Sequence, residues 1–189
     1  GGLSLKLVGG GTEFPEFPAG VGGDTIVLPC RALAGLVEKV AFAAADEDSR
    51  VFLTGVLFKA VPSADGAKIV AAATDGSRLA EATAHAQGDA GGMAGRLVPK
   101  RAAQQIARLL AEKEGDAVMS FSGSFVHVVG GGVKLAARLL DAAFPDHERF
   151  FPGDGNIVDV PLIGLRALIK RVAIVANPSN HALDLIAGK

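Results

Sequence analysis

Hydrophobic residues follow a helical rhythm in three segments of the chain, residues 29–45, 99–113 and 161–176. Within each segment, apolar side chains recur at three- and four-residue spacing, which places them on one face of a helix. Each segment begins with a proline, whose missing N–H costs little there because the first N–H groups of a helix have no partner within it. The sequence therefore predicts three amphipathic helices, each with one stripe to bury against a sheet.

Between the helices the pattern changes to short segments of β character. Glycines, often preceded by Asp or Ser, separate these segments, which favours tight hairpins. The pattern predicts an α+β fold in which a βαβββ unit occurs twice, with mostly antiparallel sheets and the helices on one side. The predicted strands after the first two helices are residues 51–60, 68–74 and 78–84, then 117–122, 125–129 and 133–140, with Asp65-Gly66 and Asp75-Gly76 as turns.

The first and third helical segments are copies of one sequence pattern. Residues 26–42 align with residues 158–174 at a constant offset of 132, which pairs Leu36 with Leu168. A fainter copy at residues 96–110 matches the first at an offset of 70. One full unit of the repeat therefore holds two similar halves.

This repeat sets the expected domain organisation. The length and the balance of apolar and charged residues are those of one or two globular domains. The chain opens within a β-like run at residues 3–8 and lacks a starting methionine, so we expect it to be a piece of a longer protein. We expect residues 1–22 to be the C-terminal tail of a first domain, residues 23–153 a complete second domain, and residues 154–189 the start of a third.

Charge separates the three predicted helices from the rest of the chain. The helices contain nine Lys or Arg and two acids, a balance of +7, while the remaining residues sum to −8. At 100° per residue, Arg101 and Arg108 fall opposite the apolar Ile106. Such a face is either simply solvated or contacts the phosphates of duplex DNA, independently of base sequence. Because the chain has no Trp or Tyr, base stacking is not expected.

No constellation of catalytic or metal-binding residues is visible in the sequence. The four histidines lack metal-ligand spacing, and the glycine-rich runs lie between predicted strands. An acidic loop at residues 46–48 either binds a cation or is solvated. The lone Cys30 indicates a buried hydrophobe in a reducing compartment, and no apolar run reaches the ~18 residues of a membrane span. We therefore expect a cytoplasmic protein without catalytic residues, metal site, cofactor or membrane partner.

Five short motifs point to a family. They are LTGVL at residues 53–57, TDGSRL at 74–79, VPKR at 98–101, FPDHER at 144–149 and VAIVANPSN at 172–180. In order and spacing they resemble the bacterial DNA sliding clamp, the β subunit of DNA polymerase III, across nearly all of the chain.

The resemblance implies a fold, an activity and partners. It implies the DNA clamp fold, in which each subunit has three similar domains and a homodimer closes into a ring, with helices lining the hole and antiparallel sheets outside. Such a ring encircles double-stranded DNA and tethers the replicative polymerase without catalysis of its own. The implied protein partners are the α subunit of DNA polymerase III, the clamp loader and other proteins that carry a clamp-binding motif.

The resemblance also implies a peptide-binding pocket between the second and third domains. Apolar side chains would form its floor, and two arginines would hold carboxylate or carbonyl groups of the peptide. Its other wall belongs to a part of the family's sequence that this chain lacks, so the pocket is expected to be half-built. Taken alone, residues 74–79 also fit an ordinary hairpin turn. The implied pocket residues are Leu53, Thr74, Gly76, Ser77, Arg78, Leu79, Pro145, Arg149 and Phe150.

The expected DNA-binding residues come from two sources. The resemblance implies Arg50, Lys100 and Arg101, and the phase of the predicted helices adds Arg108, Arg166, Lys170 and Arg171.

Three hypotheses for function remain open at this point. The first is a processivity ring, and the second is a truncated clamp homologue that binds peptides or DNA without forming a ring. The third is a small hydrolase whose site the sequence does not reveal. Retention on nicked circular DNA distinguishes the first two, and peptide binding by an Arg78→Ala variant distinguishes either from the hydrolase.

Overall fold

The computed structural model describes residues 23–64, 66–87, 93–151, 153, 158–176 and 183–186. It divides the chain into two compact units, Gly1–His147 and Glu148–Lys189. Several sequence predictions lie outside the described residues: the strand at residues 3–8 with the rest of the 1–22 tail, Asp65 of the first hairpin turn, residues 177–180 of the last motif, and His181.

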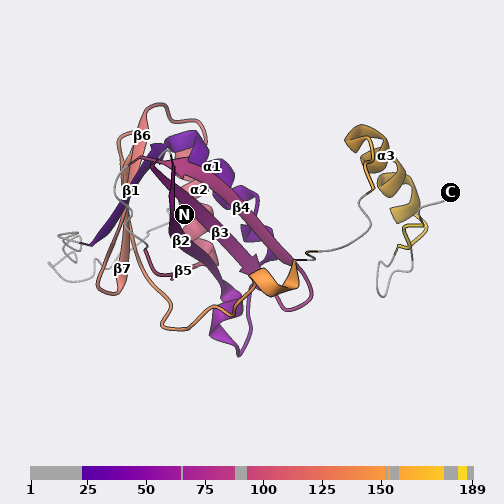
Figure 1. Cartoon of the computed structure of the whole chain (residues 1–189), viewed down its shortest axis with the longest axis horizontal. Coiled ribbons are helices and arrows are strands. Elements are labelled where there is room, and N and C mark those ends of the chain that lie inside the picture. The colour runs from indigo at the N-terminus through magenta and orange to yellow at the C-terminus, as the bar shows by residue number, and fades with distance from the viewer. Residues whose placement is uncertain are drawn as a thin grey trace, which may run out of the picture. The chain divides into compact units, whose positions relative to one another are not determined.

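Two four-stranded antiparallel sheets form the first unit, as the sequence predicts (Figure 1). One sheet has the order β1 (Asp24–Pro29), β6 (Asp116–Ser122), β7 (Phe125–Gly130) and β8 (Val133–Arg138). The other has the order β4 (Leu79–Ala86), β3 (Gly66–Thr74), β2 (Gly55–Ser63) and β5 (Arg96–Pro99).

The two halves of the repeat exchange their first strands. Strand β1 begins the first half but pairs with β6 of the second, and β5 begins the second half but pairs with β2 of the first. The sheets are also joined where Gln87 N donates to Val27 O at 2.8 Å and Leu140 N donates to Leu97 O at 2.9 Å. Because each half completes the other's sheet, the two halves form one cooperative domain.

Each strand that opens a half runs directly into a helix. Helix α1 (Cys30–Glu38) follows β1, and α2 (Lys100–Leu110) follows β5. Pro29 and Pro99 occupy the N-cap positions with nearly equal φ of −54° and −52°, so each proline precedes its helix rather than forming the first helical residue. Past the end of α1, the predicted helix continues only as the 3-10 turn η1 (Ala41–Ala43).

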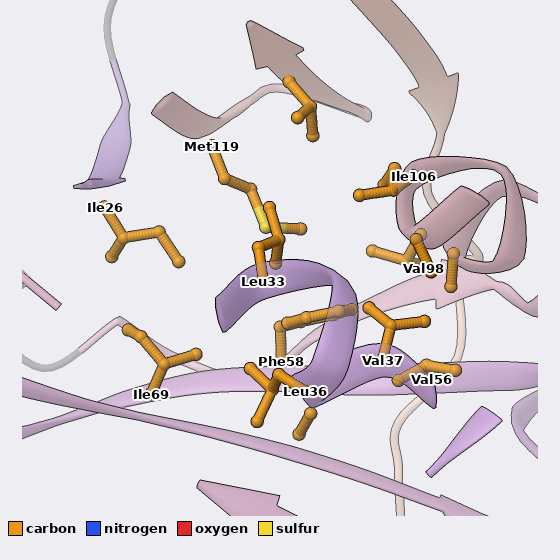
Figure 2. Packing of buried hydrophobic residues seen from close by; sticks show 14 of the residues in the cluster. Ile26, Leu33, Leu36, Val37, Val56, Phe58, Ile69, Val98, Ile106 and Met119 are labelled. Carbon is orange, nitrogen blue, oxygen red and sulfur yellow. The ribbon is translucent and has the colours of Figure 1, made fainter. Parts of the chain in front are cut away.

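The core lies where α1 and α2 pack against both sheets. Figure 2 shows Leu33 of α1 between Met119 of one sheet and Phe58 of the other, with Leu36 of the same helix on the other side of Phe58. All four side chains are at most 2% exposed. Burying a side chain of this size contributes about 1.5–3 kcal/mol, so these residues hold the helices against the sheets.

One predicted strand begins later than expected. Residues 51–60 were expected to be extended, but η2 (Val51–Thr54) is a 3-10 turn and β2 begins at Gly55. The Thr54 hydroxyl donates to Val51 O at 2.9 Å, a local bond that competes with sheet pairing. At Gly55, a Cβ would lie 2.7 Å from Leu97 Cγ, so glycine allows β2 to approach β5. The β-branched and aromatic residues before Gly55 therefore misled the strand prediction.

The second unit contains η3 (Glu148–Phe150) and α3 (Leu162–Ala173). The prediction that α3 buries an apolar stripe is wrong for this structure, because Leu168, Ile169 and Val172 are 53%, 38% and 41% exposed. The described residues of this unit include no strand against which α3 could pack. In the described parts of the chain, no helix has both the length and the apolar character needed to cross a membrane.

Candidate functional site

The turn between β3 and β4 is held by side-chain hydrogen bonds. Asp75 Oδ1 accepts from Ser77 N at 2.9 Å and from Arg78 N at 3.0 Å. The Thr74 hydroxyl donates to Arg78 O at 2.7 Å and accepts from Gly76 N at 3.0 Å. The hydrogen bonds from the backbone N–H groups of Ser77 and Arg78, that of Ser77 first, lower the pKa of Asp75. Gly76 has φ +92°, which glycine adopts without strain.

Arg78 is fixed on both sides as it leaves this turn. Its Nε donates to Asp75 Oδ2 at 2.9 Å, and its guanidinium carbon lies 5.8 Å from the centroid of the Phe42 ring. Phe42 lies in η1 and is 56% exposed. The guanidinium of Arg78 is therefore held in one orientation while most of its surface stays accessible.

Two residues that precede β2 in the sequence, Arg50 and Leu53, lie close to this turn. A Cβ at Gly76 would lie 3.6 Å from Arg50 Nη2 and 4.0 Å from Leu53 Cδ1. The Arg50 guanidinium donates two hydrogen bonds to Asp48 at 3.1 Å each, which lowers the pKa of Asp48 and raises that of Arg50. The structure thus brings Leu53 to the turn as expected, but at 1% exposure Leu53 lies beneath its surface. Arg50, expected to bind DNA, lies beside the same turn.

The remaining expected pocket residues fall into both units. Pro145 is half-buried near the end of the first unit, between Phe144 and the buried His147. His147 Nε2 is hydrogen-bonded to Glu81 Oε2 at 2.8 Å, and the Phe144 ring meets the imidazole edge-on at 5.4 Å. Arg149 and Phe150 belong to the second unit, where both are exposed and the Arg149 guanidinium carbon lies 4.9 Å from the Phe150 ring centroid.

The outer face of α2 is polar and cationic. Arg101, Gln104 and Arg108 are exposed, while Ile106 on the opposite side is 1% exposed, which agrees with the phase predicted from the sequence. Neither Arg101 nor Arg108 has an ion-pair partner among the described residues. This face is therefore able to contact an external anion.

Lys100 differs from these neighbours. Its Nζ donates to Ala44 O at 2.7 Å and to Asp46 Oδ1 at 2.8 Å, and its side chain is only 12% exposed. The hydrogen bond from Lys100 lowers the pKa of Asp46. This contact could not be predicted from the sequence, because 54 residues separate the partners and the spacing of neither residue signals it. The acidic loop is thus occupied by internal cations, Asp46 by Lys100 and Asp48 by Arg50.

The cations expected on α3 lie on its surface. Arg166, Lys170 and Arg171 are exposed along α3 in the second unit. In the part of the chain that the structure describes, no three His, Cys, Asp or Glu side chains gather in a way that would hold a metal ion.

Known proteins share this fold and sequence. Residues 27–146 match the family described as DNA polymerase III beta subunit, central domain. The beta sliding clamp of Caulobacter vibrioides (strain NA1000 / CB15N) is 33% identical over 175 residues, which cover 92% of this chain and 47% of that protein. The beta sliding clamp of Pseudomonas aeruginosa is 29% identical over 177 residues, which cover 92% of this chain and 46% of that protein.

Solved structures agree with these sequence matches. The crystal structure of a sliding clamp from Pseudomonas aeruginosa bound to griselimycin has a TM-score of 0.77 and 29% identity, and the match covers 89% of this chain and 45% of that one. The chain therefore spans about half the length of the curated relatives it matches. On this evidence the chain belongs to the bacterial DNA polymerase III beta subunit (beta sliding clamp) family, and residues 27–146 are its central domain.

Proposed function

We propose that this chain works as part of a DNA sliding clamp, a non-catalytic cytoplasmic processivity factor that encircles duplex DNA as a homodimeric ring and tethers the replicative polymerase. The observation that carries the proposal is the two-sided character of α2. Ile106 packs into the core, while Arg101 and Arg108 project outward and form no ion pair within the part of the chain that the structure describes. Membership of the sliding clamp family supports the same function.

The proposed DNA contact is electrostatic. Exposed arginines neutralise phosphates and release counterions whatever the base sequence, which suits a protein that slides. Arg101, Arg108 and the exposed cations of α3, Arg166, Lys170 and Arg171, are the strongest candidates. Lys100 and Arg50 already hold Asp46 and Asp48, so we assign them a smaller share of the contact.

The proposed protein contact is centred on the turn at residues 74–79. Arg78 is oriented by Asp75 and Phe42 and suits a carboxylate or carbonyl group of an extended peptide, with the half-buried Leu79 beside it. The related clamp bound to griselimycin supports the presence of a ligand site in this fold. We propose that the polymerase α subunit, the clamp loader and other motif-bearing proteins use this site, together with the remaining pocket residues Leu53, Thr74, Gly76, Ser77, Pro145, Arg149 and Phe150.

DNA topology tests the ring. The full chain would be mixed with nicked circular DNA and passed through a gel-filtration column, before and after the circle is linearised. A ring stays on the circle and is lost after linearisation, because it slides off the free ends. Equal retention on both forms would support a truncated homologue that binds without encircling. Absence of retention on either form at low salt would contradict the DNA-binding proposal altogether.

Peptide titration tests the turn. A fluorescein-labelled clamp-binding peptide with acidic and apolar side chains would be titrated against the full chain and the Arg78→Ala variant. We expect the variant to bind about tenfold more weakly, because it loses a charge-assisted hydrogen bond of about 1.5 kcal/mol or more. Arg31→Ala is the matched control, since Arg31 is an exposed arginine on α1 whose partner is Glu114. Equal affinity in the Arg78 and Arg31 variants would contradict the assignment.

A further inference from the structure

The first unit has a hollow that includes neither the β3–β4 turn at residues 74–79 nor the cationic face of α2. It has a volume of about 630 Å³ and lies where the ends of the two sheets meet. Arg96 and Leu97 of β5 form one wall, and Gly123 and Ser124 of the β6–β7 turn form another. Arg138 at the end of β8 and residues 139–143, which follow it, form the remainder. A hollow of this size is within the range of small-molecule sites.

Arg96 in this wall has an unsatisfied hydrogen-bond donor. Its Nε is shielded from solvent and has no acceptor among the described residues. Its Nη2 reaches Asp24 Oδ2 only at 3.6 Å, which is too long for a strong hydrogen bond. A buried donor on a charged group costs more when unsatisfied than a neutral one, so native structures normally supply an acceptor. The structure therefore favours an acceptor that the described residues do not provide.

Arg138 adds a second positive charge to the same hollow. It is exposed at the end of β8 and forms no ion pair with any described residue. Asp141 contributes the opposing negative charge in the lining. Two of the three charged residues in the lining are cations, while Asp24, outside the lining, lies 3.6 Å from Arg96. The Ser124 hydroxyl is a further donor. The two guanidinium groups and the hydroxyl can all donate hydrogen bonds to phosphate oxygens.

We propose that this hollow binds the phosphate group of a small anionic ligand, with Arg138 and Arg96 as its cationic contacts and Ser124 as a supporting donor. Its volume far exceeds that of one phosphate ion, so the space beside the arginines would accommodate the remainder of a ligand such as a nucleotide. The simpler occupant is water, which would satisfy Arg96 Nε without any preference for anions.

Phosphate titration distinguishes an anion site from a water-filled hollow. Thermal unfolding of the full chain would be followed as sodium phosphate is raised through the low-millimolar range only, against sodium chloride at equal ionic strength, because concentrated phosphate stabilises proteins without binding to them. Adenosine monophosphate would be titrated in parallel by calorimetry. We expect phosphate to raise Tm above the chloride series. Tighter binding of the nucleotide would identify it as the better ligand, and equal affinities would show that only the phosphate group is recognised.

Variants decide whether the arginines form the site. Arg138→Gln removes an exposed cation and should weaken phosphate binding about tenfold or more, and Arg96→Lys, which retains the charge but lacks Nε, should also weaken it. Lys134→Gln is the matched control, because Lys134 is an exposed cation on the same strand outside the lining and should leave affinity unchanged. The proposal is overturned if phosphate acts no differently from chloride, or if Arg138→Gln binds as tightly as the unmodified chain, which would indicate an adventitious ion only.

Discussion

Helices α2 and α3 carry the same sequence pattern in two different environments. Ile106 of α2 and Leu168 of α3 occupy equivalent positions of the repeat, as does Leu36 of α1. Leu36 and Ile106 are 2% and 1% exposed, whereas Leu168 is 53% exposed. An amphipathic pattern therefore specifies a helix and its apolar face, while burial of that face depends on sheets that other segments supply.

The beginning of each helix, by contrast, is the same in both environments. Pro99 before α2 and Pro161 before α3 are both N-cap residues, with φ of −52° and −60°. This geometry follows from the proline ring and needs no tertiary contact. The position at which each helix begins is therefore set locally by its proline. The stability gained by burying the apolar face of the helix depends instead on tertiary packing.

Alanine substitutions at the three equivalent positions should give the largest difference in the free energy of unfolding between the buried and the exposed helices. Leu36→Ala and Ile106→Ala each leave a cavity in the core and should lower the free energy of unfolding by about 2–5 kcal/mol. Leu168→Ala changes an exposed side chain and should alter it by no more than about 0.5 kcal/mol. Urea unfolding followed by circular dichroism measures all three. Equal losses at Leu36 and Leu168 would mean that α3 is packed as tightly as α1.

Lys100 and Arg101 provide a smaller contrast within α2. Lys100→Ala removes the mostly buried stem of a lysine and its bond to the Ala44 carbonyl, so we expect a loss of about 1 kcal/mol in unfolding free energy. Arg101→Ala removes an exposed cation and should change stability by less than about 0.5 kcal/mol. Thermal unfolding of both variants checks this. If Arg101→Ala were the more destabilising change, the assignment of Lys100 as the structural cation would be wrong.

The smallest expected effect is a pH dependence of stability that the β3–β4 turn should show and the β6–β7 turn should not. Asp75 holds the β3–β4 turn, whereas the β6–β7 turn relies on Gly123 at φ +55° and has no carboxylate. Because the pKa of Asp75 is lowered below its ordinary 3.8 on folding, its contribution is present above that value and is lost as pH falls through the folded pKa.

Asp75→Asn should therefore cost about 0.5 kcal/mol at pH 7, a figure kept small for a solvated turn, and progressively less as the pH falls below 3.8. Unfolding curves of the unmodified chain and the variant across this pH range measure the difference. A gap that stays constant with pH would show that the charge of Asp75 is not what holds the turn.

Periodicity and repeats predicted much of this fold because they record local geometry. The helices after Pro29, Pro99 and Pro161, the antiparallel hairpins and the outward phase of Arg101 and Arg108 are confirmed by the structure. The exchange of β1 and β5 between halves was not predicted, because strand composition does not specify a pairing partner.

The arrangement of the candidate site was only partly predictable. The motif at residues 74–79 identified the turn, and its Asp-Gly pair indicated the hairpin. The contacts that orient it come from residues distant in sequence, as with Phe42 beneath Arg78. The Lys100–Asp46 pair and the burial of Leu53 are likewise products of tertiary packing. Sequence spacing carries no record of such contacts.

The salt dependence of duplex binding tests the cationic helix face most directly. Affinity of the full chain for a labelled DNA duplex would be measured from low to moderate salt, alongside a variant with Arg101→Gln and Arg108→Gln and a control with Lys68→Gln and Lys134→Gln, which removes two exposed cations from the strands. Loss of two phosphate contacts should reduce the slope of log affinity against log salt by about 1.8 in the α2 variant alone. Equal slopes for the α2 variant and the control would contradict the account.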